Sequence, residues 1–510
     1  MESDNVSTDG TAGHACTSCK ENKRRCDKKL PSCSLCLRTG RVCDYSDSLQ
    51  PNYTDEINDL RNRVRELEQH ASFLDSDILS LCSLAVGPRH FVVPEFVSAT
   101  LGSKDDIQNV MSLYFESVHI WMPIISKTKL NRLMDQTKEV MKADTALLLL
   151  CMRLVQDTPS DQQAAVSELY SLAKEYNHDL ERNGLVSLRT VQAGLLISVY
   201  ELGHGIYPAA FTSIGHCARG RVALGLHDKS APQLAGRCFS WVDWEEKQRV
   251  WWMVVILDRY VTVGSDYRPM CTEDPNKDTL LPGDDKAWDS GRVSLSSSSN
   301  GVTTPFSRLA QASNLLGRVI RHCNDRTMEG KFALDDFYIL CQTITSLIEL
   351  VPVDDSLSSM ELCVASSICF SALLKLSNHH SCDMLSEDGQ YLDPEVAPRV
   401  RACMQRCLEM MKDISGRVIS LVQALREHIS TTTMIRLSPL VLHCIYNCAT
   451  NLSWMSLETN NPQYATGKRI CQDILRVIYI RWKVAGKYSP YCFIDDLLTL
   501  VPGRMRAADR

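Results

Sequence analysis

Six cysteines near the start of the chain have the residue type and spacing that point most directly to chemistry. They are Cys16, Cys19, Cys26, Cys33, Cys36 and Cys43. The unit C-x2-C-x6-C occurs twice with an offset of 17 residues, so each cysteine of the first half has a counterpart in the second. Each close C-x2-C pair presents two thiolates from one tight turn, which suits a small tetrahedral ion such as zinc.

The number of sulfurs predicts two zinc ions rather than one. One tetrahedral zinc uses four thiolates and would leave two spare, whereas two zincs need eight sulfur contacts, which six thiolates supply if two of them bridge. By symmetry, the first cysteine of each half, Cys16 or Cys33, fits the bridging role best. Because a segment of about 30 residues cannot build its own core, metal binding and folding should be one event.

The segment 14–45 resembles the fungal Zn2Cys6 binuclear cluster family of DNA-binding proteins. Besides the six cysteines, the resemblance is carried by Lys20, by the basic run Lys23–Arg25 and by Pro31 in the loop that joins the halves. It implies two Zn2+ ions per chain, bound by the six cysteines, in a nuclear protein that binds double-stranded DNA.

Two other interpretations of the cysteines are a disulfide cluster and a structural zinc knot that binds protein. Disulfides need an oxidising compartment, but the chain starts MESDNVSTDG, which is acidic and polar and has no apolar region of a signal peptide. Charge argues against the plain zinc knot: residues 14–43 hold eight Lys and Arg against two acids, whereas the whole chain has a formal charge of −6. Localised positive charge on an acidic chain is typical of a nucleic-acid-binding module.

The basic residues concentrate in the first half of the repeat, so its helix is the one expected to enter the major groove. The residues expected to contact DNA are Lys20, Lys23, Arg24, Arg25, Lys28 and Lys29. By the resemblance, Lys23 reads a G·C-rich, CGG-like triplet with the help of main-chain carbonyls, while the other five contact phosphates. One module reads too few bases to be selective in a genome, so a second copy is expected.

A dimerisation element is predicted directly after the module. Residues 46–55 are polar, include Pro51 and serve as a linker, and a heptad pattern follows over residues 56–82. The seam residues are Ile57, Leu60, Val64, Leu67, Ala71 and Leu74. β-Branched residues that alternate with leucine favour a parallel two-stranded coiled coil, and hence a homodimer. The alternative is an amphipathic helix that packs on its own domain.

Beyond the coiled coil, helical periodicity predicts a large all-α domain over residues 100–510, with disordered segments at 1–13 and 290–305. The two clearest apolar faces are Ile107, Val110, Met111, Tyr114 and Val118, and Val400, Met404, Cys407, Met411 and Ile414. No apolar run approaches the ~20 residues of a membrane span, so no membrane partner is expected.

One stretch of this domain resembles the middle homology region often attached to Zn2Cys6 modules. Its signature is Glu245–Glu246, Arg249, Trp251–Trp252, Asp258–Arg259, Arg268–Pro269 and Leu281–Pro282. The residue types indicate structure rather than catalysis. Trp251 and Trp252, with Val255 and Ile256, are expected in the core of one buried helix, and Asp258 and Arg259 are expected to pair or to cap neighbouring elements.

Sixteen further cysteines and several histidines need no chemical role. Cys403 and Cys407, like Cys444 and Cys448, are spaced i,i+4 and are expected to be small buried hydrophobes of a reducing compartment. No phosphate-binding, dinucleotide-binding, metalloprotease or nucleophile-elbow motif occurs, so no enzyme is expected.

Two hypotheses remain. The first is a dimeric, sequence-specific transcription factor of RNA polymerase II genes, with DNA, a second copy and the transcription machinery as partners. By resemblance to short family members, it would control one gene cluster, for example for a secondary metabolite. The second is a zinc-stapled interaction or scaffold protein. The sequence names no target gene, half-site spacing, sign of regulation or small-molecule effector.

The coiled coil gives a first testable prediction. Replacing both Leu60 and Leu67 with charged residues should convert a fragment of residues 1–85 from dimer to monomer, because buried seam charge cannot be solvated. The zinc module should stay folded, since zinc and not the coil stabilises it. Analytical ultracentrifugation measures the mass. A wild-type fragment that stays monomeric at micromolar concentration on DNA with two half-sites would remove the coiled coil.

Overall fold

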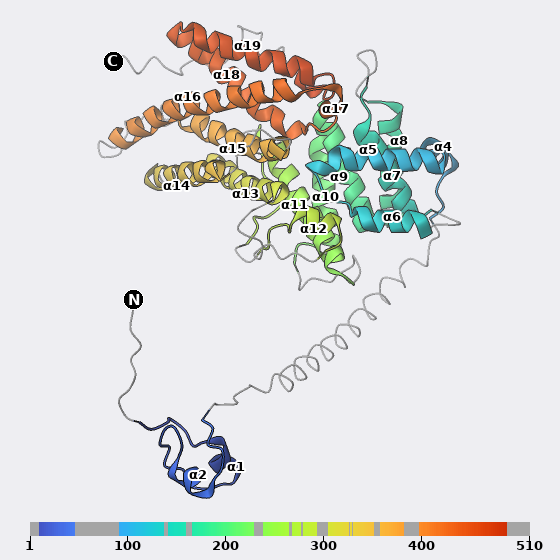
Figure 1. Ribbon diagram of the computed structural model, residues 1–510. Coiled ribbons are helices and arrows are strands. Elements are labelled where there is room, and N and C mark those ends of the chain that lie inside the picture. Colours follow the sequence, from blue (N-terminus) through green and yellow to red (C-terminus); the bar gives the residue numbers. More distant parts are fainter. Residues whose placement is uncertain are drawn as a thin grey trace. The chain divides into compact units, whose positions relative to one another are not determined.

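The chain divides into two compact units, Met1–Arg89 and His90–Arg510 (Figure 1). The computed structural model describes residues 10–45, 91–136, 141–159, 166–228, 238–264, 268–276, 279–292, 304–325, 327–328, 330–350, 358–381 and 397–486. The predicted linker at 46–55 and the predicted coiled coil at 56–82 lie outside these residues, as does most of the predicted insertion at 290–305.

The first unit is a structural repeat. Its two short helices are α1 (Thr17–Glu21) and α2 (Ser34–Thr39). The amide of Lys20 donates to the carbonyl of Cys16 at 3.0 Å, and 17 residues later the amide of Leu37 donates to the carbonyl of Cys33 at 3.0 Å. The sequence repeat therefore builds the same helix-initiating turn twice.

Residues 10–13 correct the expected boundary of this unit. The amide of Ala12 donates to the carbonyl of Lys28 at 2.7 Å, and the amide of Leu30 donates to the carbonyl of Gly10 at 3.0 Å. The prediction that residues 1–13 are disordered is therefore wrong for 10–13. The physical reason is that a loop without a helix ladder needs other backbone partners, and the preceding segment supplies them.

The second unit is built from helices. They are α4 (Glu95–Leu101), α5 (Lys104–Glu116), η1 (Val118–Ile120), α6 (Lys127–Gln136), α7 (Ala143–Gln156), α8 (Glu168–Arg182), α9 (Leu188–His204), α10 (Ala209–Ala223), α11 (Trp241–Val263), α12 (Asp285–Asp289), α13 (Pro305–Asn324), α14 (Gly330–Glu349), α15 (Ser358–His380), α16 (Ala397–His428), α17 (Thr431–Met434), η2 (Pro439–Val441), α18 (Leu442–Thr459) and α19 (Pro462–Ile478). The described part of this unit has no strand, which confirms the all-α expectation. The unit begins before the expected boundary at 100, because α4 starts at Glu95.

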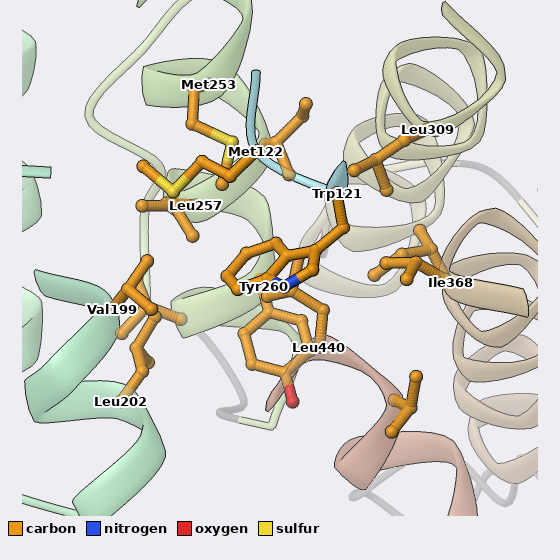
Figure 2. Close-up of a cluster of buried hydrophobic side chains, with 14 of the residues drawn as sticks. Trp121, Met122, Val199, Leu202, Met253, Leu257, Tyr260, Leu309, Ile368 and Leu440 are labelled. Atoms are coloured by element: carbon orange, nitrogen blue, oxygen red, sulfur yellow. The ribbon is translucent and has the colours of Figure 1, made fainter. Parts of the chain in front are cut away.

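One contiguous core fills this unit, and it draws on elements far apart in the sequence. Figure 2 shows Trp121 and Tyr260 beside Val199, Ile368 and Leu440. The two predicted apolar faces lie on α5 with η1 and on α16, and both contribute buried residues to this core, as expected. None of the described helices is long and apolar enough to span a membrane.

Helix α11 is the central element, because every residue from Arg249 to Val263 is buried. Trp251, Trp252, Val255 and Ile256 lie in the core as the sequence predicts. The same helix also carries charged residues into that core, and each of them must find a partner there.

Asp258 and Arg259 find their partners in the segment 268–276. The carboxylate of Asp258 accepts hydrogen bonds from the amide of Thr272 at 2.8 Å and from its hydroxyl at 2.6 Å. The guanidinium of Arg259 donates to the carbonyl of Glu273 at 2.8 Å. As expected, the two side chains contact each other and hold a neighbouring element, here an irregular segment.

Arg249 likewise holds the segment before α12 through hydrogen bonds. Its guanidinium is fully buried and donates to Glu245 at 2.8 Å, to Asp285 at 2.6 Å and to the carbonyl of Gly283 at 2.9 Å. It also lies 4.3 Å from the centroid of the Trp288 ring. Arg249, Asp258 and Arg259 of the second resemblance are therefore buried structural ties.

The last described residues close the domain. Trp482 is fully buried, and its indole donates to the carbonyl of Leu437 at 2.8 Å. Its ring lies against Gly203 of α9, where a Cβ atom would come within 2.1 Å of the ring. Arg481 donates to the carbonyl of Asp157 at 3.1 Å, just past the end of α7.

The ties of α11 give a stability prediction. Asp258→Ala should lower the free energy of unfolding of the helical unit by about 3–5 kcal/mol, because it removes the buried carboxylate beside the Arg259 guanidinium and leaves the backbone amides of Cys271 and Thr272 without their acceptor. Asp473→Ala, which removes an exposed i,i+3 pair with Arg476, should change it by less than about 1 kcal/mol. Urea unfolding followed by circular dichroism compares the two. Equal effects would contradict the assigned role of Asp258.

Candidate metal centre

The six cysteine sulfurs form two groups of four, and within each group all Sγ atoms lie within 4.8 Å of one another. The groups are Cys16, Cys19, Cys26, Cys33 and Cys16, Cys33, Cys36, Cys43. Cys16 and Cys33 belong to both groups, and they are the two residues that symmetry assigns to the bridging role. In the described part of the chain, no other set of three or more His, Cys, Asp or Glu side chains comes together in this way.

The spacing of the sulfurs fits zinc. A tetrahedron with zinc–sulfur bonds of about 2.3 Å has edges of about 3.8 Å. The Sγ–Sγ distance is 3.8 Å from Cys16 to Cys33, 3.7 Å from Cys19 to Cys33 and 3.6 Å from Cys16 to Cys36. Cys19 and Cys36, one from each group, are 3.9 Å apart, so the six sulfurs make one compact cluster. The donor set is all thiol, as in structural zinc sites.

The two short helices position the sulfurs. Cys16 precedes α1 and Cys33 precedes α2, each as the N-terminal cap, so both C-x2-C pairs wrap around the start of a helix. The Sγ atom of Cys33 accepts a hydrogen bond from the amide of Cys36 at 3.4 Å, and the amide of Cys33 donates to Cys43 Sγ at 3.1 Å. Burial raises the pKa of the Cys16 thiol far above its usual value. A thiolate at this position therefore needs a cation for its stability.

Asp27, which the sequence analysis does not single out, also holds the cluster together. Its carboxylate accepts the amide of Ser34 at 3.0 Å and the hydroxyl of Ser34 at 2.5 Å. These hydrogen bonds, the hydroxyl first, lower the pKa of Asp27. Asp27 thereby ties the loop after Cys26 to the first residue of α2. The signal in the sequence was an acid one residue after the third cysteine, but its partner seven residues later could not be identified from spacing.

The predicted DNA-contacting side chains divide into two classes. The exposed ones are Lys20, Lys23, Arg24, Arg25 and Lys29. Lys28 is half-buried, and its ammonium donates to the carbonyl of Gly13 at 3.0 Å. Five of the six therefore present their charge to solvent, whereas Lys28 already holds the segment that precedes the first cysteine.

The backbone of Lys23 is unusual. Its φ angle is +49°, a left-handed value that L-residues rarely adopt, and at the matching place in the second half, 17 residues later, Gly40 has a φ of +63°. Glycine takes this conformation freely, whereas another residue pays about 1 kcal/mol or more. The first half thus keeps a strained lysine where the second half uses glycine. Aligning the two halves of the repeat pairs Lys23 with Gly40 and is the signal that sequence reasoning overlooked.

Two protein families match the chain. Residues 14–52 match the fungal Zn(2)-Cys(6) binuclear cluster domain. Residues 111–372, just over half of the chain, match the fungal specific transcription factor domain. The second match ends within α15, although the helical unit continues through α16 to α19.

Several relatives are similar over large parts of their length. The transcription factor BOA15 of Botryotinia fuckeliana is 49% identical over 179 residues, which are 35% of this chain and 98% of the relative. The pigment biosynthesis transcriptional activator pigB of Monascus ruber is 23% identical over 61% of this chain and 64% of its own length. The citrinin biosynthesis transcriptional activator mrl3 of Monascus ruber is 23% identical over 61% of this chain and 72% of its own length.

The cluster geometry gives a metal prediction. The full chain should hold two zinc ions, and Cys16→Ala or Cys33→Ala should lose more zinc than any other single cysteine change, because each sulfur belongs to both groups. Mass spectrometry of the metal content measures this. Cys238→Ala, at an exposed cysteine outside the cluster, should keep two zincs. One zinc per wild-type chain, with all six cysteines still required, would rule out the shared-ligand arrangement.

Proposed function

The chain belongs to the fungal specific transcription factor family with a Zn(2)-Cys(6) binuclear cluster, and from this premise we propose that it binds DNA as a dimer in the nucleus. Membership confirms the expectations of two Zn2+ ions per chain, of a transcription factor and of no enzymatic activity.

The six cysteines hold the two zincs, with Cys16 and Cys33 as the bridges. The two sulfur groups and their edge lengths support this ligand set. Zinc has a structural task here: it replaces the apolar core that so short a module lacks, and it neutralises buried thiolates. The fold of α1, and therefore the position of every basic residue after Cys19, depends on it.

Lys23 reads the bases, and the observation that carries this assignment is an exposed side chain on a left-handed backbone. Lys28 also has a positive φ, of +59°, but its ammonium is held by the carbonyl of Gly13. A strained residue persists where function selects it, and the repeat shows that glycine suffices for the turn itself. A lysine ammonium can donate to O6 and N7 of guanine in the major groove, which fits a G·C-rich, CGG-like half-site. Lys20, Arg24, Arg25 and Lys29 then contact phosphates, and Lys28 adds charge while it holds Gly13.

The protein acts as a homodimer through the heptad seam that starts at Ile57, with residues 46–55 as the linker that sets half-site spacing. Two modules on one coiled coil supply the selectivity that one module lacks. The regulated genes belong to one biosynthetic cluster of secondary metabolism, a proposal supported by the names of the pigment and citrinin regulators among its relatives. The bound dimer recruits the transcription machinery. A zinc-stapled scaffold without DNA binding is the alternative, and it leaves the exposed basic run without a purpose.

The recognition role is tested by Lys23→Gly. Glycine keeps the left-handed turn, as Gly40 does, so the change removes the side chain without adding backbone strain. Binding to a duplex with CGG half-sites should weaken by about 1–3 kcal/mol, with little change on random duplex. Arg24→Gln should weaken both duplexes alike and reduce the salt dependence.

Fluorescence anisotropy at several salt concentrations measures both effects, and zinc content verifies the fold. Arg38→Gln, on the second helix, is the matched control and should change CGG binding less than Lys23→Gly. Equal loss on both duplexes for Lys23→Gly would remove the base-reading role. Absence of salt-dependent DNA binding by the wild-type chain would favour the scaffold.

A further inference from the structure

A cavity of about 380 Å3 lies between α8, α9 and α10 of the helical unit. Helix α9 packs against both α8 and α10. Its volume falls within the range of about 300–1,000 Å3 that is usual for small-molecule sites. The transcription factor function described above does not use this cavity, and none of its lining residues belongs to the buried ties of α11.

Two glycines in the cavity lining let α9 and α10 approach each other closely. A Cβ atom on Gly194 of α9 would lie 2.8 Å from the sulfur of Cys217, and one on Gly220 of α10 would lie 3.1 Å from Val191. The two helices therefore pack closely beside the cavity. Val191 and Ile197 give the wall an apolar surface.

The polar end of the cavity carries a positioned cation. The ammonium of Lys174 donates to Glu201 Oε1 at 2.6 Å and to the hydroxyl of Ser213. Glu201 is fully buried and also accepts a hydrogen bond from the hydroxyl of Tyr170 at 2.7 Å. The Glu201 carboxylate is therefore held in place, and it holds the Lys174 ammonium in turn. An ammonium has three N–H donors, and these contacts use two of them. The third is available to a ligand in the cavity that Lys174 lines.

The other charged groups of the lining favour an anion. Arg219, His178 and His216 stand at the rim together with one acid, Glu181. All four are exposed. Because Lys174 is paired with Glu201, the balance at the rim is set by Arg219 and the two imidazoles against the single carboxylate of Glu181. A ligand with an acidic group and an apolar body would complement both the polar end and the apolar wall of the cavity.

We propose that this cavity binds an amphipathic organic acid, whose carboxylate contacts Lys174 and Arg219 and whose apolar body lies against Val191 and Ile197. The site is independent of DNA recognition. Helix α9 also sends Val199 and Leu202 into the central core (Figure 2). A ligand that clamps α9 between its neighbours therefore stabilises the helical unit as a whole.

The test uses the full-length zinc-loaded chain with decanoate, 1-naphthoate and salicylate, each compared with its uncharged amide. Isothermal titration calorimetry should show one acid bound per chain for at least one probe, at least tenfold more tightly than the matching amide. The same acid should raise the melting temperature of the helical unit. No binding of any acid at millimolar concentration, or equal binding of acid and amide, would overturn the proposal.

Variants locate the site. Ala223→Phe fills the mouth from an exposed lining position, and it should weaken acid binding at least tenfold. Val222→Phe is the matched control, because Val222 is also exposed but lies outside the lining. Lys174→Met should remove the preference for acid over amide. If the unpaired Glu201 destabilises that variant, Arg219→Gln at an exposed position should weaken acid binding instead.

Unchanged binding in Ala223→Phe would place the acid elsewhere and overturn the site. Binding to CGG duplex, measured separately on the same samples, tells failure of this proposal apart from failure of the DNA-binding proposal, because acid binding requires no DNA.

Discussion

A charged side chain on a buried helix needs a partner from a neighbouring segment. Helix α11, buried from Arg249 to Val263, imposes this requirement on the segments around it. Arg249, Asp258 and Arg259 cannot reach water, so irregular segments come to them. The segment 268–276 lies where Asp258 can accept its amides, and the segment before α12 lies where Arg249 can donate to Gly283. The positions of these loops are thus fixed by the charged side chains of the buried helix. The arrangement also gives these three charged residues a structural role.

The zinc module solves the opposite problem, because it has almost no apolar interior to fold around. Its buried residues are cysteines, and its sulfurs take the place that leucines take elsewhere. Around them, backbone hydrogen bonds and Asp27 decide where each turn begins. The module can therefore expose nearly all of its basic side chains, since none of them is needed to fill a core. Lys28 is the exception, because its ammonium holds the segment 10–13.

Patterns that repeat at short range could be predicted from the sequence. The cysteine spacing predicted two sulfur groups that share Cys16 and Cys33, and helical periodicity predicted the buried faces of α5 and α16. Contacts between distant residues could not be predicted in this way. The local sequence around Gly203 does not predict that Trp482 will pack on it, because that contact depends on how the described helices from α10 to α19 fold between them. The tie from Asp27 to Ser34 and the cavity over Gly194 are of the same kind. Each depends on which backbones come close in space.

The contact between Trp482 and Gly203 also has a consequence for the order of events during synthesis. A ribosome releases the chain from its N-terminus, and domains fold as units as they emerge. All six cysteines of the zinc module are available once residue 43 is out, so metal capture can be early and local. The helical unit cannot complete its fold early. The surface of α9 beside Gly203 stays uncovered until Trp482 has been synthesised. For most of its translation the chain therefore has a folded zinc module followed by a helical unit that cannot yet complete its fold. We expect its need for chaperones to be greatest during that period.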